Sequence, residues 1–322
     1  MDRENLINSF LKNSISENFT REKIKGDASF RKYERIICEG KNYILMDAPP
    51  EKEDVKPFIN ICKTLINLGF SAPNIFNEDI QNGFLLLEDF GDNKFSTILI
   101  NNINQEEKLY KNAVDCLIEL YKKTASQKFS IAEYGKTKLL EEANLFTNWF
   151  IPYFFKPSES ELNSIKKAYE EIILEAISKL NYPNNCLVLR DYHADNLIDL
   201  PERKTFQNVG LLDFQDALVG NPAYDLASLL EDARRDVSIN IQHKMFDYFV
   251  EKLALDKAKF MQDYQIIAMQ RNLKILGIFT RLKVRDGKEN YLQFIPRVKN
   301  YLMQDLQNKS LENAKNFITK FI

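Results

Sequence analysis

Between Glu53 and Leu68 the chain repeats apolar and polar residues with the period of an α-helix. The apolar members of this pattern are Val55, Phe58, Ile59, Cys62, Leu65 and Ile66. Side chains spaced three and four residues apart fall on one face of a helix, so the segment is predicted to be an amphipathic helix. Gly69 follows directly and is expected to end this helix as a C-cap residue.

The residues around this helix favour strands. Runs rich in branched and aromatic residues predict strands at Phe30 to Glu39, Tyr43 to Asp47, Ile75 to Phe76 and Phe84 to Leu87. A turn at Asn82-Gly83 joins the last two into a hairpin, and Glu4 to Lys12 is predicted to be a short amphipathic helix. The first ninety or so residues are therefore expected to form a small α+β unit.

After Gly91 the pattern becomes mostly helical. Helices are predicted at Glu106 to Thr124, Thr137 to Phe150, Glu159 to Leu180, Tyr224 to Ala233, Ile239 to Leu253 and Gln262 to Leu282. Short strands are predicted at Leu187 to Leu189 and Val209 to Leu212. The expected fold class is α+β, with two lobes. A β-rich lobe spans residues 1–90 and a hinge residues 89–92. A mainly helical lobe spans residues 91–322.

The charge of the chain argues against nucleic acid as a partner. The 322 residues carry a formal net charge of −2, whereas nucleic-acid-binding proteins usually carry a strong positive excess or a basic stripe. The four cysteines are scattered without a Cys-x-x-Cys pair, so they are expected to be free buried thiols in a reducing cytosol.

No uncharged apolar run approaches the roughly twenty residues needed to span a bilayer. The first thirteen residues also lack the apolar core of a signal peptide. We therefore expect a cytoplasmic protein without a membrane partner.

The strongest chemical signal is the segment Leu189 to Asn196, which reads Leu-Arg-Asp-Tyr-His-Ala-Asp-Asn, followed later by Asp213. Phosphoryl transfer from ATP requires a carboxylate near the attacking hydroxyl and oxygen ligands for Mg²⁺. Asp191, which follows an apolar run, is predicted to be the catalytic base. Asn196 and Asp213 are predicted to hold Mg²⁺, since this ion prefers hard oxygen ligands. Turn-forming roles are the alternative for each residue alone, but the combination favours an ATP- and Mg²⁺-dependent kinase. The two lobes are then expected to form a bilobal protein-kinase-like fold. In that fold residues 1–90 bind the nucleotide, and residues 91–322 carry the catalytic loop and the acceptor site.

Two neighbouring residues are predicted to support this loop. His193 is expected to hydrogen-bond the loop or to position Asp213. Asp225 lies at the start of a predicted helix, where a carboxylate interacts well with free backbone N–H groups.

The nucleotide is expected to bind near the loop that joins the first two strands, where kinases cover the ATP phosphates with backbone N–H groups. This loop has one glycine, Gly26, so an ordinary strand connection is the alternative. The hinge is expected to meet the adenine through backbone groups. The predicted nucleotide contacts are Ser29, Phe30 and Arg31 in the loop and Glu88, Asp89 and Phe90 at the hinge.

These motifs carry a resemblance to a known family. Residues 189–196, 212–215 and 222–227 resemble the aminoglycoside phosphotransferase and choline-kinase-like superfamily. Residues 26–33, 45–50 and 86–92 are similar to its N-acetylmuramate/N-acetylglucosamine anomeric kinase group, which phosphorylates the C1 hydroxyl of these amino sugars in peptidoglycan recycling. The resemblance implies a sugar kinase in which Asp191 is the base and Asn196 and Asp213 hold Mg²⁺.

The chain departs from the kinase pattern at one position. Kinases commonly place a lysine on the third strand to pair with the α- and β-phosphates, but Met46 stands at that place here. Arg31, Lys32 or Arg35 is expected to supply the missing cation, and Arg31 is our first choice.

The resemblance places the acceptor, a small hydroxylated molecule, on the helical lobe. Trp149 and Tyr153 are predicted to stack on a sugar ring, and Arg234 to meet a carboxylate such as the lactyl group of muramate. Core packing for the aromatic residues and a solvated helix end for the arginine are the alternatives. Two other functions stay open. One is a kinase of another metabolite or of an aminoglycoside, and the other is a nucleotide-binding regulator without turnover.

Overall fold

The computed structural model describes residues 2–24, 30–125 and 127–322, which group into two compact units. Unit 1 comprises Met1–Gln105 and Asp195–Asp216, and unit 2 comprises Glu106–Ala194 and Ala217–Ile322. The sequence predicts two lobes that meet at residue 90. The compact units differ from these lobes, because residues 195–216 group with the N-terminal part of the chain. The functional division at residue 90 stays a prediction.

An antiparallel sheet forms the centre of unit 1. Its strands are β1 (Thr20–Ile24), β2 (Lys32–Cys38), β3 (Lys41–Asp47), β4 (Ile75–Asp79) and β5 (Phe84–Glu88). Their order across the sheet is β1-β2-β3-β5-β4, and every neighbouring pair is antiparallel. The predicted hairpin around Asn82-Gly83 is confirmed as β4 and β5.

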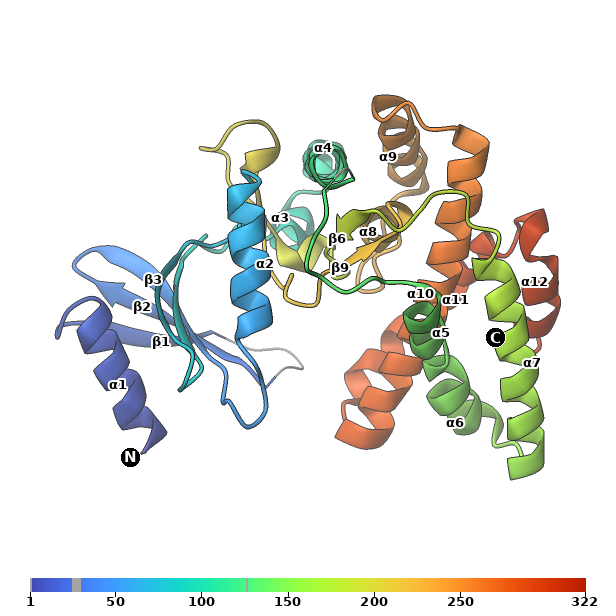
Figure 1. The fold of residues 1–322 in the computed structure, drawn as a ribbon, viewed down its shortest axis with the longest axis horizontal. Helices are drawn as coiled ribbons and strands as arrows, with labels where there is room; N and C mark the ends of the chain where they lie inside the picture. The colour runs from blue at the N-terminus through green and yellow to red at the C-terminus, as the bar shows by residue number, and fades with distance from the viewer. Residues whose placement is uncertain (1, 25–29, 126) are drawn as a thin grey trace. The chain divides into compact units, whose positions relative to one another are not determined.

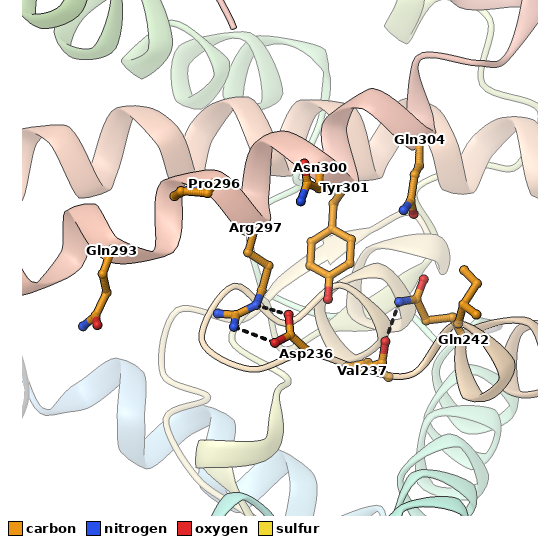
Figure 2. Close-up of a pocket in the computed structure, with 10 residues that line it drawn as sticks. Asp236, Val237, Gln242, Gln293, Pro296, Arg297, Asn300, Tyr301 and Gln304 are labelled. Atoms are coloured by element: carbon orange, nitrogen blue, oxygen red, sulfur yellow. Dashed lines mark hydrogen bonds and ion pairs between the residues drawn. The ribbon is translucent and has the colours of Figure 1, made fainter.

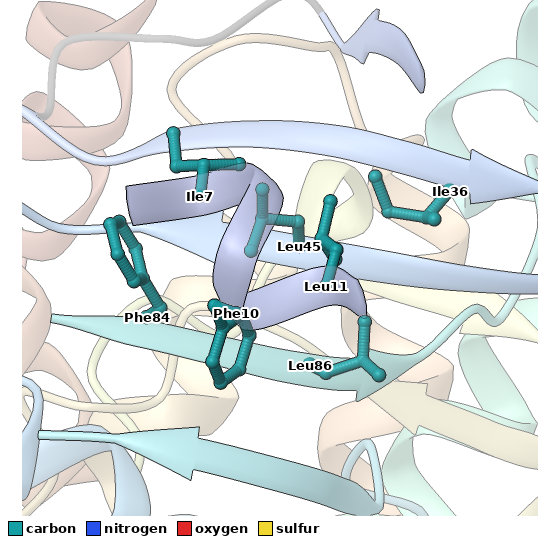
Figure 3. Packing of buried hydrophobic residues seen from close by; sticks show 7 residues of the cluster. All are labelled: Ile7, Phe10, Leu11, Ile36, Leu45, Phe84 and Leu86. Atoms are coloured by element: carbon teal, nitrogen blue, oxygen red, sulfur yellow. The ribbon is translucent and has the colours of Figure 1, made fainter. Parts of the chain in front are cut away.

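Helix α1 (Arg3–Ser14) packs on one face of this sheet. Leu45 and Leu86 lie directly opposite each other on β3 and β5, so their side chains share a face. The helix contributes its apolar side to the same core. The buried cluster consists of Ile7, Phe10, Leu11, Ile36, Leu45, Phe84 and Leu86 (Figure 3).

Helix α2 (Lys56–Asn67) lies on the other side of the sheet from α1 (Figure 1). It is the helix that the apolar spacing predicts from Glu53, and it starts three residues later, with Pro57 in its first turn. A proline there loses no hydrogen bond, because the first N–H groups of a helix have no intrahelical partner. The side chains that it buries are Phe58, Ile59, Ile61, Cys62 and Leu65.

The rest of unit 1 is short elements. They are α3 (Phe95–Asn101), η1 (Ile103–Gln105), β7 (Leu197–Asp199), η4 (Thr205–Asn208) and β8 (Val209–Leu211). Strands β7 and β8 form an antiparallel hairpin. The absence of a side chain at Gly210 allows strand β8 to pack against Phe90 of the predicted hinge. A Cβ atom at this residue would lie only 2.9 Å from the Phe90 ring, which is too close.

Unit 2 is mainly helical. Its elements begin with α4 (Glu106–Thr124), α5 (Lys136–Ala143), η2 (Phe146–Phe150), α6 (Ile151–Phe155), α7 (Glu159–Ile177), β6 (Cys186–Val188) and β9 (Leu218–Gly220). They continue with α8 (Ala223–Leu230), α9 (Ile239–Lys252), α10 (Lys257–Asp286), η5 (Glu289–Phe294), α11 (Ile295–Asp305), η6 (Lys309–Leu311) and α12 (Glu312–Ile318). Helix α10 packs against α5, η2, α8 and α11 (Figure 1). Strand β6 pairs with β9.

The predicted helix from Thr137 to Phe150 is wrong in detail. Helix α5 ends at Ala143, a turn of π-helix (η2) follows, and α6 continues past Pro152. Pro152 has no N–H for the carbonyl four residues earlier, which favours a change of helical pitch. Helix α10 also passes very close, since a Cβ on Gly277 would lie 2.3 Å from the carbonyl carbon of Leu145.

The four cysteines are free and buried, as predicted. None of the helices in the described ranges is both long enough and apolar enough to cross a membrane. The expected α+β class, with a β-rich N-terminal part and a helical C-terminal part, is confirmed.

Candidate active site

The two predicted metal ligands lie at the same end of the β7–β8 hairpin in unit 1. Asn196 directly precedes β7, and Asp213 comes two residues after β8. The N–H of Leu212 donates a hydrogen bond of 3.0 Å to the carbonyl oxygen of Asn196. Because the start of one antiparallel strand lies beside the end of its partner, the register brings the backbones of the two segments together.

A strained turn presents the carboxylate of Asp213. Its φ of 57° is in the left-handed region, which is uncommon for a residue with a side chain. The next residue, Phe214, is fully buried and stacks on Phe58 of α2, with ring centroids 5.0 Å apart. Gln215 Nε2 donates to Asp213 Oδ1 at 3.0 Å. The buried ring anchors the turn, and 44% of the Asp213 side chain stays exposed.

This donor set suits Mg²⁺ bound together with a nucleotide. No group of three or more His, Cys, Asp or Glu side chains that could hold a metal occurs in the described part of the chain. Mg²⁺ typically takes one or two protein carboxylates and completes its shell with water and phosphate oxygens. One carboxylate and one amide oxygen, from Asp213 and Asn196, match that requirement.

Arg31 is the predicted phosphate-binding cation, and its side chain approaches Asp213. Its Nη2 lies 3.6 Å from Asp213 Oδ1, its Nε lies 4.0 Å from Glu53 Oε2, and only 11% of the side chain is exposed. The nearby Tyr33 is packed closely enough that burial raises the pKa of its hydroxyl to about 12. Arg31 therefore places a positive charge beside the predicted metal ligand.

The position of the missing lysine is part of the core. Met46 lies directly opposite Tyr33 in the β2–β3 register, so the two side chains share a face of the sheet. Met46 is fully buried. Arg35, another candidate cation, is held elsewhere, because it bonds both Asp89 (2.6 and 3.2 Å) and Asp92 (2.9 and 3.0 Å).

The predicted hinge residues make structural contacts through their side chains. The carboxylate of Asp89 accepts from Arg35 and from the N–H of Gly91, at 2.8 Å for the latter. Glu88 pairs with Arg203, whose guanidinium lies 5.0 Å from the centroid of the Phe90 ring. Any contact of these residues with adenine is thus expected from backbone groups and stays a prediction.

The loop predicted to cover the phosphates lies partly outside the described residues. Ser29 lies outside the described residues. Phe30 is 60% exposed, and the ammonium group of Lys52 lies 5.1 Å from its ring centroid. Their contacts with a nucleotide stay predictions.

Asp225 holds the backbone in front of the predicted base in unit 2. It lies in the first turn of α8 and accepts hydrogen bonds from the N–H groups of Leu189 (2.6 Å) and Arg190 (2.8 Å). Arg190 has a φ of 72°, and its carbonyl accepts from Ser228 Oγ at 3.2 Å. These contacts pin the turn that leads into Asp191, which is the geometry a supporting role for Asp225 requires.

The side chains after Asp191 anchor the loop. Tyr192 is buried and donates to the carbonyl of Ala113 at 2.8 Å, whereas Asp191 itself is exposed. His193 is also buried, and its Nε2 lies 3.2 Å from Nη1 of Arg234. A guanidinium can only donate, so Nε2 is the acceptor in this bond. The exposed Asp191 is thereby followed by two buried side chains that anchor the loop.

Asp225→Asn is expected to remove a pH-dependent part of the stability. Burial raises the pKa of Asp225 to about 7, against about 4 for an exposed aspartate. Between these two pKa values the carboxyl of Asp225 is protonated in the folded chain and ionised in the unfolded chain. The free energy of unfolding therefore falls as pH rises through this range. The slope is at most about 1.4 kcal/mol per pH unit. Urea unfolding at about pH 5 and about pH 7 measures it, and parallel pH dependence in both proteins contradicts the prediction.

A cluster that the sequence did not indicate adjoins this loop in unit 2. The buried carboxylate of Glu142 pairs with Arg190 and, at 2.8 Å, with Lys274 of α10. Tyr134 also bonds Glu142, and Tyr224 lies 3.2 Å from the ammonium group of Lys274. Arg190 is part of the catalytic motif, but no local pattern marks Glu142 or Lys274 as its partners.

The predicted acceptor residues lie on three different segments of unit 2. Trp149 and Tyr153 are half-buried on η2 and α6, and Arg234 contacts His193. A surface pocket of about 450 Å³ lies between α11 and the segment after α8. Figure 2 shows the side chains of Arg297 and Asp236 paired among its lining residues, and the bonds between them are 2.6 and 2.9 Å long. None of the three predicted residues lines this pocket, so their acceptor contacts stay predictions.

Residues 20–257, which include the catalytic motif, the hairpin and Arg31, match the family described as the phosphotransferase enzyme family. This chain belongs to that family. The match includes every motif on which the resemblance rests, and it confirms the phosphotransferase family.

Three curated relatives of this phosphotransferase carry the name N-acetylmuramate/N-acetylglucosamine kinase. The protein of Caulobacter vibrioides is 31% identical, over 100% of this chain and 97% of the relative. That of Pseudomonas aeruginosa is 34% identical, over 86% of this chain and 80% of the relative. That of Neisseria meningitidis is 33% identical, over 86% of this chain and 82% of the relative.

Solved structures of other phosphotransferases share the fold. The complex of gentamicin with the aminoglycoside phosphotransferase APH(2")-IIa has a TM-score of 0.64 at 16% identity, and the match covers 97% of this chain and 98% of that one. Choline kinase from Streptococcus pneumoniae has a TM-score of 0.63 at 15% identity, covering 94% and 99%. At such low identity these likenesses establish the fold, and they confirm the predicted protein-kinase-like class.

Proposed function

We propose that this phosphotransferase is a Mg²⁺- and ATP-dependent kinase of the anomeric hydroxyl of N-acetylmuramate and N-acetylglucosamine. The observation that carries the proposal is identity of 31% over the whole chain with a relative of that name. The placement of Asn196 beside Asp213, with Arg31 3.6 Å from that carboxylate, supports it independently. Since the reaction consumes ATP, we place it in the cytoplasm.

In this proposal Asp191 accepts the proton of the sugar C1 hydroxyl as that oxygen attacks phosphorus. Its exposed carboxylate sits on a loop that Asp225 and Tyr192 hold by hydrogen bonds to and from the backbone. A base held in this way contributes typically 10²–10⁴-fold to the rate, roughly. The left-handed backbone conformation of Arg190 and the two hydrogen bonds that Asp225 accepts from the backbone orient the base before the substrate binds.

Asn196 and Asp213 hold Mg²⁺ in this proposal, and Arg31 meets the phosphates. Bound Mg²⁺-ATP supplies the phosphoryl group and neutralises its negative charge in the transition state. The guanidinium of Arg31 replaces the ammonium group that kinases usually place where Met46 stands. It offers several N–H donors to phosphate oxygens.

Arg31→Ala is expected to raise the KM for ATP about tenfold or more, because a hydrogen-bonded charge is lost from the phosphate site. The matched control is Lys32→Ala, which removes an exposed cation from the next residue of the chain. Initial rates at varied ATP measure both. An unchanged KM and kcat in the Arg31 variant, or an effect only in the Lys32 variant, would assign the phosphate cation elsewhere.

The experiment that tests the proposed function is ADP release from Mg²⁺-ATP with a panel of acceptors. The panel contains N-acetylmuramate, N-acetylglucosamine, choline, homoserine and an aminoglycoside, and phosphorus NMR locates the phosphate in any product. A C1-phosphate of an N-acetylated amino sugar is the expected result. Turnover of another acceptor alone would replace the substrate, and ATP binding without turnover of any acceptor would favour a regulator.

A further inference from the structure

Two buried carboxyl groups share one amide at the C-terminal end of α8. Glu231 directly follows this helix and Asp305 is the last residue of α11, and the two residues are only 4% and 3% exposed. The side-chain NH₂ group of Asn272 on α10 donates to Glu231 Oε2 at 2.7 Å and to Asp305 Oδ2 at 3.0 Å. Such a group has two N–H donors, so one is directed at each carboxyl. The end of α8 is thus joined to α10 and α11 through this pair of acids.

Two ionised carboxylates are unfavourable in this position. Like charges at this separation repel each other, and burial removes the water that would weaken the repulsion. Arg271 is a cation that acts on both carboxyls, and its Nη1 donates to the backbone carbonyl of Glu231 at 3.1 Å. It also acts on Asp225 and Asp232. One shared positive charge does not neutralise two further carboxylates, so one acid of the pair is expected to hold a proton.

The hydrogen bonds indicate which acid holds this proton. Glu231 accepts from Asn272 and from the hydroxyl of Tyr264 on α10, and these bonds stabilise its ionised form. Asp305 accepts from Asn272 and is in hydrogen-bond contact with Glu231. Burial and the negative charge of Glu231 raise the pKa of Asp305 well above its usual value. A proton on Asp305 that is donated to Glu231 satisfies every one of these contacts.

We propose that Asp305 keeps its proton at neutral pH and donates it to Glu231, and that this bond holds the end of α8 against α10 and α11. The inference goes beyond the proposed function, because it assigns a pH-sensitive contact to the fold. All eight side chains of α8 are buried. At the other end of the helix, Asp225 holds the backbone in front of the proposed base. Loss of the proton at alkaline pH puts two negative charges together and weakens the attachment of α8.

Other titratable groups face the pair from α10 and α11. Burial raises the pKa of Tyr301 on α11 to about 12 and that of Tyr264 well above its usual value, so both hydroxyls keep their protons between pH 7 and 9. Asp232, the next residue after the pair on its own segment, has three cations as neighbours, Arg234, Arg235 and Arg271. The acid pair is therefore the group expected to change its charge as pH rises above neutrality.

The test compares urea unfolding of the wild-type protein, Glu231→Gln and Asp305→Asn at pH 7.5 and 8.5. Each amide keeps an N–H donor between the two side chains but has no proton to lose. An unfolded chain has ordinary carboxyl pKa values of about 4, so the folded wild-type protein holds one proton more. Its ratio of unfolded to folded protein is therefore expected to rise with pH by up to about tenfold more per pH unit than that of either variant.

Two choices isolate the acid pair in this comparison. The pH range lies above the pKa of about 7 of Asp225, so that carboxyl contributes little to the difference. Glu251→Gln is the matched control, because Glu251 is an exposed glutamate near the end of α9. This control is expected to keep the pH dependence of the wild-type protein.

A second arm observes the proton in the wild-type protein. Carbon-13 in the aspartate carboxyl groups identifies the infrared C=O band of a protonated aspartate. At pH 8.5 this band is expected in the wild-type protein and in Asp225→Asn, and it is expected to disappear in Asp305→Asn. Absence of the band from the wild-type protein overturns the inference even if the variants fold poorly.

Hydrogen exchange tests whether the proton holds α8. After correction for the intrinsic exchange rate, the backbone amides of α8 in the wild-type protein are expected to lose up to about tenfold of their protection between pH 7.5 and 8.5. In Glu231→Gln their protection is expected to stay constant. An equal loss in both proteins would contradict the role of the pair in holding this helix.

Two further results would overturn the inference. The same pH dependence of unfolding in the wild-type protein and in both pair variants would exclude a shared proton. A protonated glutamate in place of the aspartate would contradict the assignment to Asp305. None of these measurements uses an acceptor or ATP, so their failure leaves the proposed function standing, and failure of the acceptor panel leaves this inference standing.

Discussion

Asp191→Asn is expected to lower kcat by about 10²–10⁴-fold while leaving the KM for ATP within about twofold of the wild-type value. Asparagine has nearly the same shape as aspartate but cannot accept the proton of the attacking hydroxyl. The loop should keep its conformation, since Asp225 and Tyr192 hold it through contacts that do not involve the Asp191 side chain. Steady-state rates at saturating sugar measure the change.

The control for this prediction is Asp195→Asn, which removes a carboxylate four residues further along the same loop. A similar loss of kcat in both variants would show that the overall charge of the loop matters more than the base. Nearly normal turnover by the Asp191 variant would contradict the assignment. A raised KM for ATP with an unchanged kcat would instead place Asp191 at the nucleotide.

Asp213→Ala is expected to lower kcat/KM for ATP by at least about 10²-fold and to abolish the Mg²⁺ dependence of nucleotide binding. It is the one carboxylate of the proposed metal site, and the neutral amide of Asn196 cannot replace its charge. Calorimetric titration with ATP, with and without Mg²⁺, measures the binding, and ADP release measures turnover. Tight Mg²⁺-dependent binding with normal turnover would refute the metal assignment.

A second variant separates charge from conformation at this position. Asp213 has a positive φ, which asparagine adopts more readily than alanine. Asp213→Asn therefore keeps the turn while removing the charge, and it is expected to lose activity nearly as fully as the alanine variant. Asp216→Ala, which removes another exposed carboxylate from the same segment, is the control.

The regular elements near each motif were predictable because their signals are local. The apolar spacing around Phe58 and Cys62 marks α2, and the branched and aromatic runs mark β2, β3 and β5. The predictions failed where packing between distant segments overrides the local pattern. The helix expected from Thr137 to Phe150 is broken, because Pro152 removes an N–H and α10 approaches Leu145 at Gly277.

In the candidate site, too, the residue types could be predicted from local sequence, whereas their arrangement depends on contacts between distant segments. Asp191, Asn196 and Asp213 were proposed from the sequence because phosphoryl transfer needs a carboxylate near the attacking hydroxyl and oxygen ligands for Mg²⁺. Their spacing says nothing of the register of β7 and β8, which links Leu212 to Asn196. The approach of Arg31 to Asp213, and the burial of Met46, likewise depend on how β2 and β3 lie in the sheet.

The sequence by itself determined the family, the α+β class and the types of residue that carry the chemistry, because periodicity and short motifs are properties of neighbouring residues. Only the tertiary structure decided which cation approaches Asp213, a predicted metal ligand, and which residues surround the proposed base. Glu142, Arg190 and Lys274 lie on three separate segments, and their charges interact only once packing removes them from water and sets them within bonding distance.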